Sequence, residues 1–135
     1  MTLLPTAILI SGRGTNMRVI AERAAAGSLP IEIRTVISDR AAAEGLEMAA
    51  AMNIPTRVLA PGDFPDRPMY DQALVRLLSE CQPQLVVLAG FMRILTPLFI
   101  DAFAGRILNI HPSLLPRYRG LHTHRRVLEA GEKLH

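Results

Sequence analysis

The sequence predicts an α/β protein with an open, mostly parallel, Rossmann-like sheet and helices on both faces. Short apolar runs alternate along the chain with stretches in which apolar residues recur at helical spacing, which is the pattern of strands joined by helices. The run Leu85 to Leu88 contains no polar residue, so we expect it to lie inside the sheet with both faces covered. A hydrophobic content of 50% with 20% charged residues fits one globular domain over residues 1–135.

Glycine and proline mark the boundaries of the expected elements. The first strand ends in Gly12-Arg13-Gly14, and the helix after it ends before Gly27. Thr96 and Pro97 have the order of an N-cap and a first helical position, and Gly105 closes that helix. The expected strands are residues 7–11, 31–38, 56–59, 85–88 and 107–112, and the expected helices are residues 17–24, 42–52, 70–81, 97–104 and 124–130.

Composition excludes several classes of protein. No apolar stretch reaches the length of a membrane span, and we read residues 1–10 as a buried strand and not as a leader. The single cysteine, Cys81, excludes an intrachain disulfide, offers no metal-ligand cluster and fits the cytoplasm; we expect it to be inert core. The net charge is +3, and residues 106–135 carry six basic and two acidic residues. This basic end can indicate a nucleic-acid partner, but it also fits a cleft for an anionic small molecule. Tyr118 is its one aromatic residue, which argues against binding of single-stranded nucleic acid.

The segment 107–112 places an amide and an imidazole two residues apart in a predicted strand. Residues i and i+2 of a strand point to the same face, so Asn109 and His111 should stand side by side while Leu108 and Ile110 pack on the other face. An amide donor beside a group that exchanges protons near neutral pH suits a carbonyl carbon under nucleophilic attack, which suggests acyl-type transfer. The alternative is that Asn109 begins a turn and His111 is a hydrogen-bonded core histidine.

A second candidate site is the turn Ser11-Gly12-Arg13-Gly14-Thr15-Asn16, which leads into a helix. Backbone N–H groups at a helix N-terminus attract anions, so phosphate is the natural ligand. The turn is not a Walker A loop, because no Gly-Lys-Ser/Thr follows. As a dinucleotide fingerprint it is defective, because Met17 stands at the third glycine position, although Asp39 could act as the ribose-binding acid. The alternative is a simple tight turn.

A third candidate site follows the fourth predicted strand, at residues 89–95. Its apolar side chains around Arg93 would wrap a flat heteroaromatic ring. The alternative is a helix lead-in packed on the sheet, with Arg93, like Arg67 in the proline-rich loop, as a surface charge. Ligands of open α/β sheets bind beyond the carboxyl ends of the strands, so we expect this segment to line one crevice with residues 12–16 and 111–120.

These segments resemble glycinamide ribonucleotide formyltransferase (phosphoribosylglycinamide formyltransferase), a folate-dependent enzyme of purine biosynthesis. The resemblance lies in residues 11–16, 87–95 and 108–116, in order along the chain. The last of these motifs is shared by the wider formyltransferase superfamily, so the first two are the ones that distinguish this family from the other members. The alternatives are formyltetrahydrofolate deformylase and a non-catalytic nucleotide-binding module.

The resemblance implies a transfer of the formyl group of 10-formyltetrahydrofolate, a co-substrate, to the amine of glycinamide ribonucleotide, with no metal, nucleic acid or membrane involved. It implies that Asn109 contacts the formyl oxygen and that His111 is the general acid. It also implies two binding sites. The phosphate would be bound by Gly14, Thr15 and Asn16, and the folate by Arg67, Met92, Arg93, Ile94, Leu95 and Asn109.

The family has a catalytic aspartate beyond a His-Gly-x-Ser-Val-His stretch, which would begin at His135. That aspartate keeps the histidine protonated, as a histidine with a pKa of about 6.5 requires in order to act as an acid at neutral pH. Asp39 and Asp101 are not obvious substitutes. The antiparallel strands and terminal helix of the family would also follow His135. We therefore expect a truncated formyltransferase N-terminal region that does not transfer formyl groups by itself.

Overall fold

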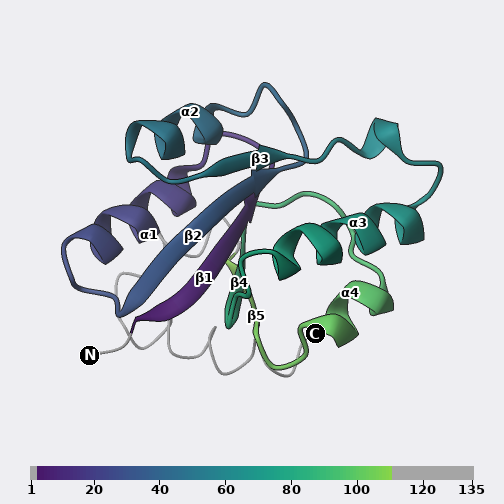
Figure 1. The fold of residues 1–135 in the computed structure, drawn as a ribbon. Helices are drawn as coiled ribbons and strands as arrows, with labels where there is room; N and C mark the ends of the chain where they lie inside the picture. The colour runs from purple at the N-terminus through teal and green to yellow at the C-terminus, as the bar shows by residue number, and fades with distance from the viewer. Residues whose placement is uncertain (1–2, 111–135) are drawn as a thin grey trace.

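The computed structural model describes residues 3–110, in which five strands form one sheet flanked by helices (Figure 1). The elements follow in the order β1 (Leu4–Ile10), α1 (Thr15–Ala25), β2 (Ile31–Ser38), α2 (Glu44–Ala51), β3 (Thr56–Val58), the 3₁₀ helix η1 (Pro61–Asp63), α3 (Arg67–Ser79), β4 (Leu85–Ala89), α4 (Pro97–Ala102) and β5 (Ile107–Ile110). Across the sheet the strand order is β3-β2-β1-β4-β5, and every neighbouring pair is parallel. The predicted fold class is confirmed.

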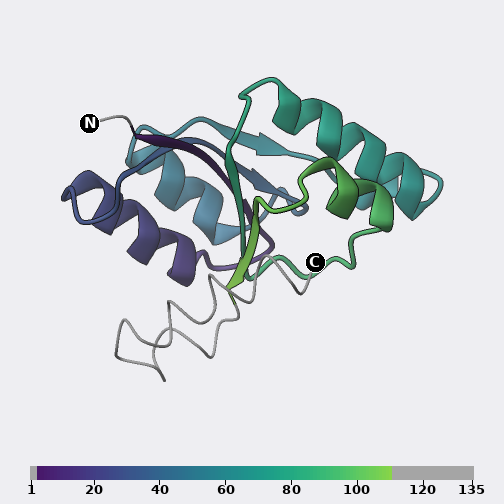
Figure 2. The same cartoon turned by 90° about the horizontal axis from the view of Figure 1, so that it is seen from below.

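Two apolar cores lie on the two faces of the sheet, because successive side chains of each strand point to opposite faces. Helices α1 and α2 cover one face, and α3 and α4 cover the other (Figure 2). In β1, Ile8 and Ile10 enter the core under α1 and α2, named here the α1-side core, whereas Ala7 and Leu9 enter the α3-side core. Strand β4 is paired with β1 and β5 and is buried, as its apolar sequence predicts.

The start of α3 lies ahead of the start that its apolar spacing predicts. Asp66 is the N-cap, and its Oδ1 accepts a hydrogen bond from the Met69 N–H at 2.9 Å. Pro68 occupies the first turn, where the missing N–H costs nothing. Cys81 follows the helix and is half-buried against the α3-side core. Burial raises the pKa of its thiol, in keeping with the inert role expected of it.

The other described elements agree closely with their expected ranges. Strand β2 has the predicted bounds, and β3 is one of the shortest elements, as expected of residues 56–59. The predicted helix at 124–130 and the end of the fifth strand at 111–112 lie outside the described residues. Within residues 3–110, no helix is long and apolar enough to cross a membrane.

Two glycines bring the starts of α1 and α2 into backbone contact. Gly14 has φ +76°, and a Cβ at this position would lie 2.6 Å from the Cα of Gly45. A Cβ on Gly45 would lie 2.5 Å from Cδ1 of Ile10 and 3.0 Å from the Cα of Gly14. The N–H of Gly45 also donates to the carbonyl of Gly12 at 3.1 Å. A side chain at Gly14 or Gly45 would therefore displace the turn after β1.

The substitution Gly14→Ala should destabilise the fold more than Gly27→Ala. Both glycines have positive φ, +76° and +81°, but the space around Gly27 is open. Gly27→Ala should therefore cost only backbone strain of about 1 kcal/mol. Gly14→Ala should cost roughly 1–3 kcal/mol more, because its methyl group meets the backbone of α2. Urea denaturation of both variants measures the difference, and equal losses of stability would show that the contact with Gly45 is not tight.

Candidate functional site

The carboxyl ends of β1 and β4 bring two of the three predicted segments together. Ser11, the residue after β1, is buried, and its Oγ accepts a hydrogen bond from the N–H of Met92 at 2.8 Å. This bond joins the glycine turn at 11–16 to residues 90–96, named here the 90–96 loop. The third segment, from His111 to Gly120, lies outside the described residues.

Among residues 3–110, no side chain caps the N-terminus of α1. Gly14 is the N-cap, and the first helical hydrogen bond runs from the N–H of Arg18 to its carbonyl at 2.8 Å. The first turn of α1 contains no acidic residue, and Thr15 is exposed. Asn16 is buried. The early N–H groups of α1 therefore have no side-chain cap in the described part of the chain, and an uncapped helix N-terminus can bind an anion.

The structure argues against the dinucleotide-binding alternative at both positions that its fingerprint uses. Met17, at the position of the third glycine, is fully buried in the α1-side core. Asp39 is also buried, with 8% of its surface exposed, and its Oδ1 has no partner among residues 3–110. An acid that binds a ribose must reach its ligand from the surface.

Strand β5 places Asn109 as its sequence predicts. Leu108 belongs to the α1-side core and Ile110 packs against the same core, whereas Ile107 belongs to the α3-side core. Asn109 therefore shares the face of Ile107 and is exposed at the carboxyl end of β5. It pairs with Leu88 of β4, two residues before the 90–96 loop begins.

The 90–96 loop has apolar side chains of two kinds, some packed on the core and some exposed. Phe91 and Leu95 pack against the α3-side core, as a helix lead-in would. Met92 and Ile94 are 78% and 67% exposed, which is unusual for large apolar side chains and typical of a wall that receives an apolar ligand. In the described part of the chain, residues 91–95 form no backbone–backbone hydrogen bond. Side chains from other elements must therefore set the conformation of the loop.

The side chain of Arg93 stacks on an aromatic side chain of α3. Its guanidinium carbon lies 4.4 Å from the centre of the Tyr70 ring, a cation–π arrangement. Its Nε is buried and has no partner among residues 3–110. Arg93 is therefore not the solvated surface charge that was one of its two sequence-based interpretations, because its side chain is partly buried. Arg67, in contrast, is exposed at the start of α3 and forms no ion pair with another described residue.

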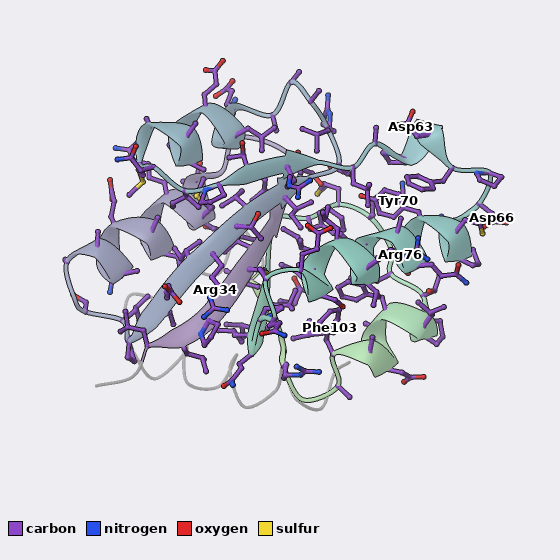
Figure 3. The ribbon with its side chains drawn as sticks, in the orientation of Figure 1. Arg34, Asp63, Asp66, Tyr70, Arg76 and Phe103 are labelled. Atoms are coloured by element: carbon purple, nitrogen blue, oxygen red, sulfur yellow. The ribbon has the colours of Figure 1, made fainter. Side chains whose placement is uncertain are left out.

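Tyr70 and Asp71 form a polar region on the inner face of α3 that the sequence did not single out. Both side chains are buried, and the Tyr70 hydroxyl donates to the carbonyl of Leu59 at 2.8 Å, between α3 and the segment after β3 (Figure 3). Oδ2 of Asp71 accepts hydrogen bonds from the N–H and the hydroxyl of Thr96, each at 2.6 Å. Thr96 is the N-cap of α4 as predicted, but its hydroxyl does not cap that helix. The signal in the sequence was an aspartate on the apolar stripe of a helix.

The described residues of this polar region do not form a group of metal ligands. Within residues 3–110, no three histidine, cysteine, aspartate or glutamate side chains gather in a group that could hold a metal ion. Burial and nearby charged side chains shift the pKa of Tyr70. Burial, and then the negative charge of Asp39, raise the pKa of the Tyr70 hydroxyl well above its ordinary value of 10, and the charge of Arg93 opposes this shift.

The chain belongs to the formyl transferase family, whose sequence pattern it matches over residues 5–135. Within this family, its relatives are phosphoribosylglycinamide formyltransferases, so the resemblance of its motifs is confirmed. The Escherichia coli enzyme is 47% identical over 128 residues, which are 95% of this chain and 60% of the relative. The Haemophilus influenzae enzyme is 46% identical over 129 residues, or 96% and 61%. The chain thus spans about 60% of the length of these curated relatives.

Solved structures agree with this assignment. The phosphoribosylglycinamide formyltransferase of Brucella melitensis superimposes with a TM-score of 0.80 at 45% identity, over 96% of this chain and 68% of that chain. Glycinamide ribonucleotide transformylase 1 of Symbiobacterium toebii gives a TM-score of 0.79 at 42% identity, over 96% and 61%. The formyltransferase fold that the motifs imply is confirmed.

The stability that Tyr70 contributes should be lost at alkaline pH. Tyr70→Phe removes the hydroxyl and leaves the Leu59 carbonyl without its donor, so it should lower the free energy of unfolding by roughly 1–3 kcal/mol. The advantage of the wild-type chain should be constant below pH 10, where tyrosine keeps its proton in both states. It should shrink as the pH rises further, because only the unfolded chain releases the proton readily. Denaturation of both proteins from pH 7 to 11 measures it, and an advantage that does not shrink would contradict the raised pKa.

Proposed function

We propose that this chain forms the phosphate- and folate-binding part of an enzyme that transfers a formyl group from 10-formyltetrahydrofolate to the amine of glycinamide ribonucleotide. The observation that carries the proposal is the hydrogen bond from Met92 N–H to Ser11 Oγ. It holds the glycine turn beside the 90–96 loop, so that an anionic substrate and a heteroaromatic co-substrate would meet at the edge of the sheet where β5 carries Asn109. The relatives named above support the same chemistry.

The ribonucleotide would be held by its phosphate at the start of α1. Gly14, Thr15 and Asn16 would supply backbone N–H groups that no side chain among residues 3–110 caps, and the positive end of the helix dipole lies among them. The close contact between Gly14 and Gly45 keeps the turn in one conformation. A preformed set of donors suits phosphate, because the donors need not be ordered when the ligand binds.

The folate would be held by the 90–96 loop and by Arg67. The exposed side chains of Met92 and Ile94 would cover the ring. Apart from the Met92 N–H, which is bonded to Ser11, the backbone groups of residues 92–95 have no partner among residues 3–110 and would be available to the polar edge of the ring. Arg93 would contribute through its backbone, since its guanidinium lies on Tyr70. Leu95 packs against the core and would support the ring from behind. Arg67, exposed at the start of α3, would meet an anionic part of the co-substrate.

The catalytic step would use Asn109 and His111. When the substrate amine attacks the formyl carbon, negative charge develops on the formyl oxygen, and an amide donor aimed at that oxygen stabilises the transition state. Asn109 is exposed on the correct face of β5 for this role. His111, as the general acid, would give its proton to the developing charge or to the leaving nitrogen of the folate.

Asn109→Ala should lower kcat by roughly 100-fold to 1000-fold in the full-length enzyme that contains this chain, because it removes one oxyanion donor. The fold should be unaffected, since the side chain is exposed. Gln84→Ala is the matched control: it removes an exposed amide before β4, at the opposite edge of the sheet. Steady-state assays decide, and an Asn109→Ala enzyme that keeps more than about a tenth of its kcat would remove Asn109 from the catalytic groups.

Inorganic phosphate should raise the thermal midpoint of the chain by binding at the glycine turn, since a ligand that binds only the folded state stabilises it. Gly14→Ala should abolish this rise because the turn is displaced. Gly27→Ala, at the other end of α1, should lower the midpoint but keep the response to phosphate. A rise with NAD and none with phosphate would instead favour a dinucleotide-binding module.

A further inference from the structure

The 90–96 loop is attached to α3 by two hydrogen bonds that Thr96 donates to one buried carboxylate. Oδ2 of Asp71 accepts from both the N–H and the Oγ1 of Thr96, each at 2.6 Å, across 25 positions of sequence. Asp71 is 1% exposed. Hydrogen bonds to a charged acceptor of this length are among the stronger ones in proteins. The end of the loop is thereby fixed to a helix that packs on the sheet.

This carboxylate is costly to keep in the fold. Its second oxygen, Oδ1, is buried without a partner among residues 3–110, and it forms no ion pair there. Burial of a charged group that is only partly hydrogen-bonded destabilises a fold, and an apolar residue on this face of α3 would pack without that cost. A contribution to stability therefore does not explain why an aspartate stands at position 71. The explanation must lie in the segment that Asp71 holds in place.

The part that it holds is the segment with the exposed apolar side chains. The loop has side-chain attachments along its length: Ser11 at Met92, Tyr70 under Arg93 and Asp71 at Thr96. Residues 91–95 form no backbone–backbone hydrogen bond within the described part of the chain. Without Asp71, the C-terminal end of the loop would keep, among the described residues, the apolar contact of Leu95 and the hydrogen bonds that the Thr96 carbonyl accepts within the first turn of α4.

We propose that Asp71 is a positioning residue for folate binding, which fixes the backbone of the 90–96 loop through Thr96 in the conformation that receives the ring. This inference rests on the proposed function. It gives Asp71, a residue of α3, a role in folate binding that involves no contact with a substrate. The competing explanation is that Asp71 only anchors the start of α4, in which case its loss would lower stability without a selective effect on either substrate.

The test is a comparison of Michaelis constants in the full-length enzyme. Asp71→Ala should raise the KM for 10-formyltetrahydrofolate by about tenfold or more, as loss of two charge-assisted hydrogen bonds predicts. It should change the KM for glycinamide ribonucleotide by less than about twofold, since the glycine turn is held by other contacts. Leu78→Ala is the stability control, because Leu78 is fully buried in the α3-side core at the far end of the same helix. It should destabilise the protein and leave both constants near wild type.

Two variants of Thr96 keep the proposal testable if Asp71→Ala does not fold. Thr96→Val removes the hydroxyl donor and keeps the N–H, so it should raise the folate KM by a smaller factor. Thr96→Ser keeps both donors and should restore the wild-type value. A folate KM unchanged in Asp71→Ala or, where that variant does not fold, in Thr96→Val, or an equal rise in both constants, would overturn the inference.

Hydrogen exchange separates this inference from the function on which it rests. In the 135-residue chain, the Thr96 amide should exchange slowly, and at least about tenfold faster in Asp71→Asn, whose neutral amide is a weaker acceptor. If the wild-type full-length enzyme transfers no formyl group, the proposed function fails. If it transfers formyl groups normally while the Thr96 amide exchanges at the same rate in both chains, the positioning role of Asp71 fails.

Discussion

The candidate site depends on the parallel pairing of strands that are buried on both faces. Strand β1 pairs with β2 and β4, and its alternating side chains enter two different cores. A shift of one residue along β1 would exchange those side chains between the cores, so its register is fixed by packing. The position of Ser11, directly after β1, is fixed with it, and so is its hydrogen bond to Met92. The packing of the core therefore sets the distance between the glycine turn and the 90–96 loop.

The sequence predicted the fold because apolar periodicity is a local signal and the strands of this sheet are strongly apolar. It predicted the two faces of β5 for the same reason, since Asn109 interrupts an otherwise apolar run. It placed the start of α3 too late, because Asp66 and Pro68 looked like parts of a loop when only apolar spacing was counted. In the structure, Asp66 is the N-cap of α3 and Pro68 lies in its first turn.

The contacts of the 90–96 loop could not be predicted from the sequence, because they join elements that are distant along the chain. Thr96 was recognised as a helix N-cap, but nothing local indicated that its hydroxyl would bond to Asp71 across 25 positions. Arg93 was left between a ligand contact and a surface charge, and its stacking on Tyr70 is a third outcome that depends on how α3 packs. Buried polar groups of this kind break the apolar pattern of a core, and such breaks are commonly found at functional sites.

The backbone contact between Gly14 and Gly45 has an evolutionary consequence. Helix α2 contributes no residue to the proposed phosphate site, yet its second residue touches the turn that forms it. A mutation at Gly45 would change the shape of that turn as surely as a mutation within it. The freedom of α2 to drift in sequence is thus restricted at one position by a neighbouring turn, and a search for binding residues by ligand contact alone would overlook it.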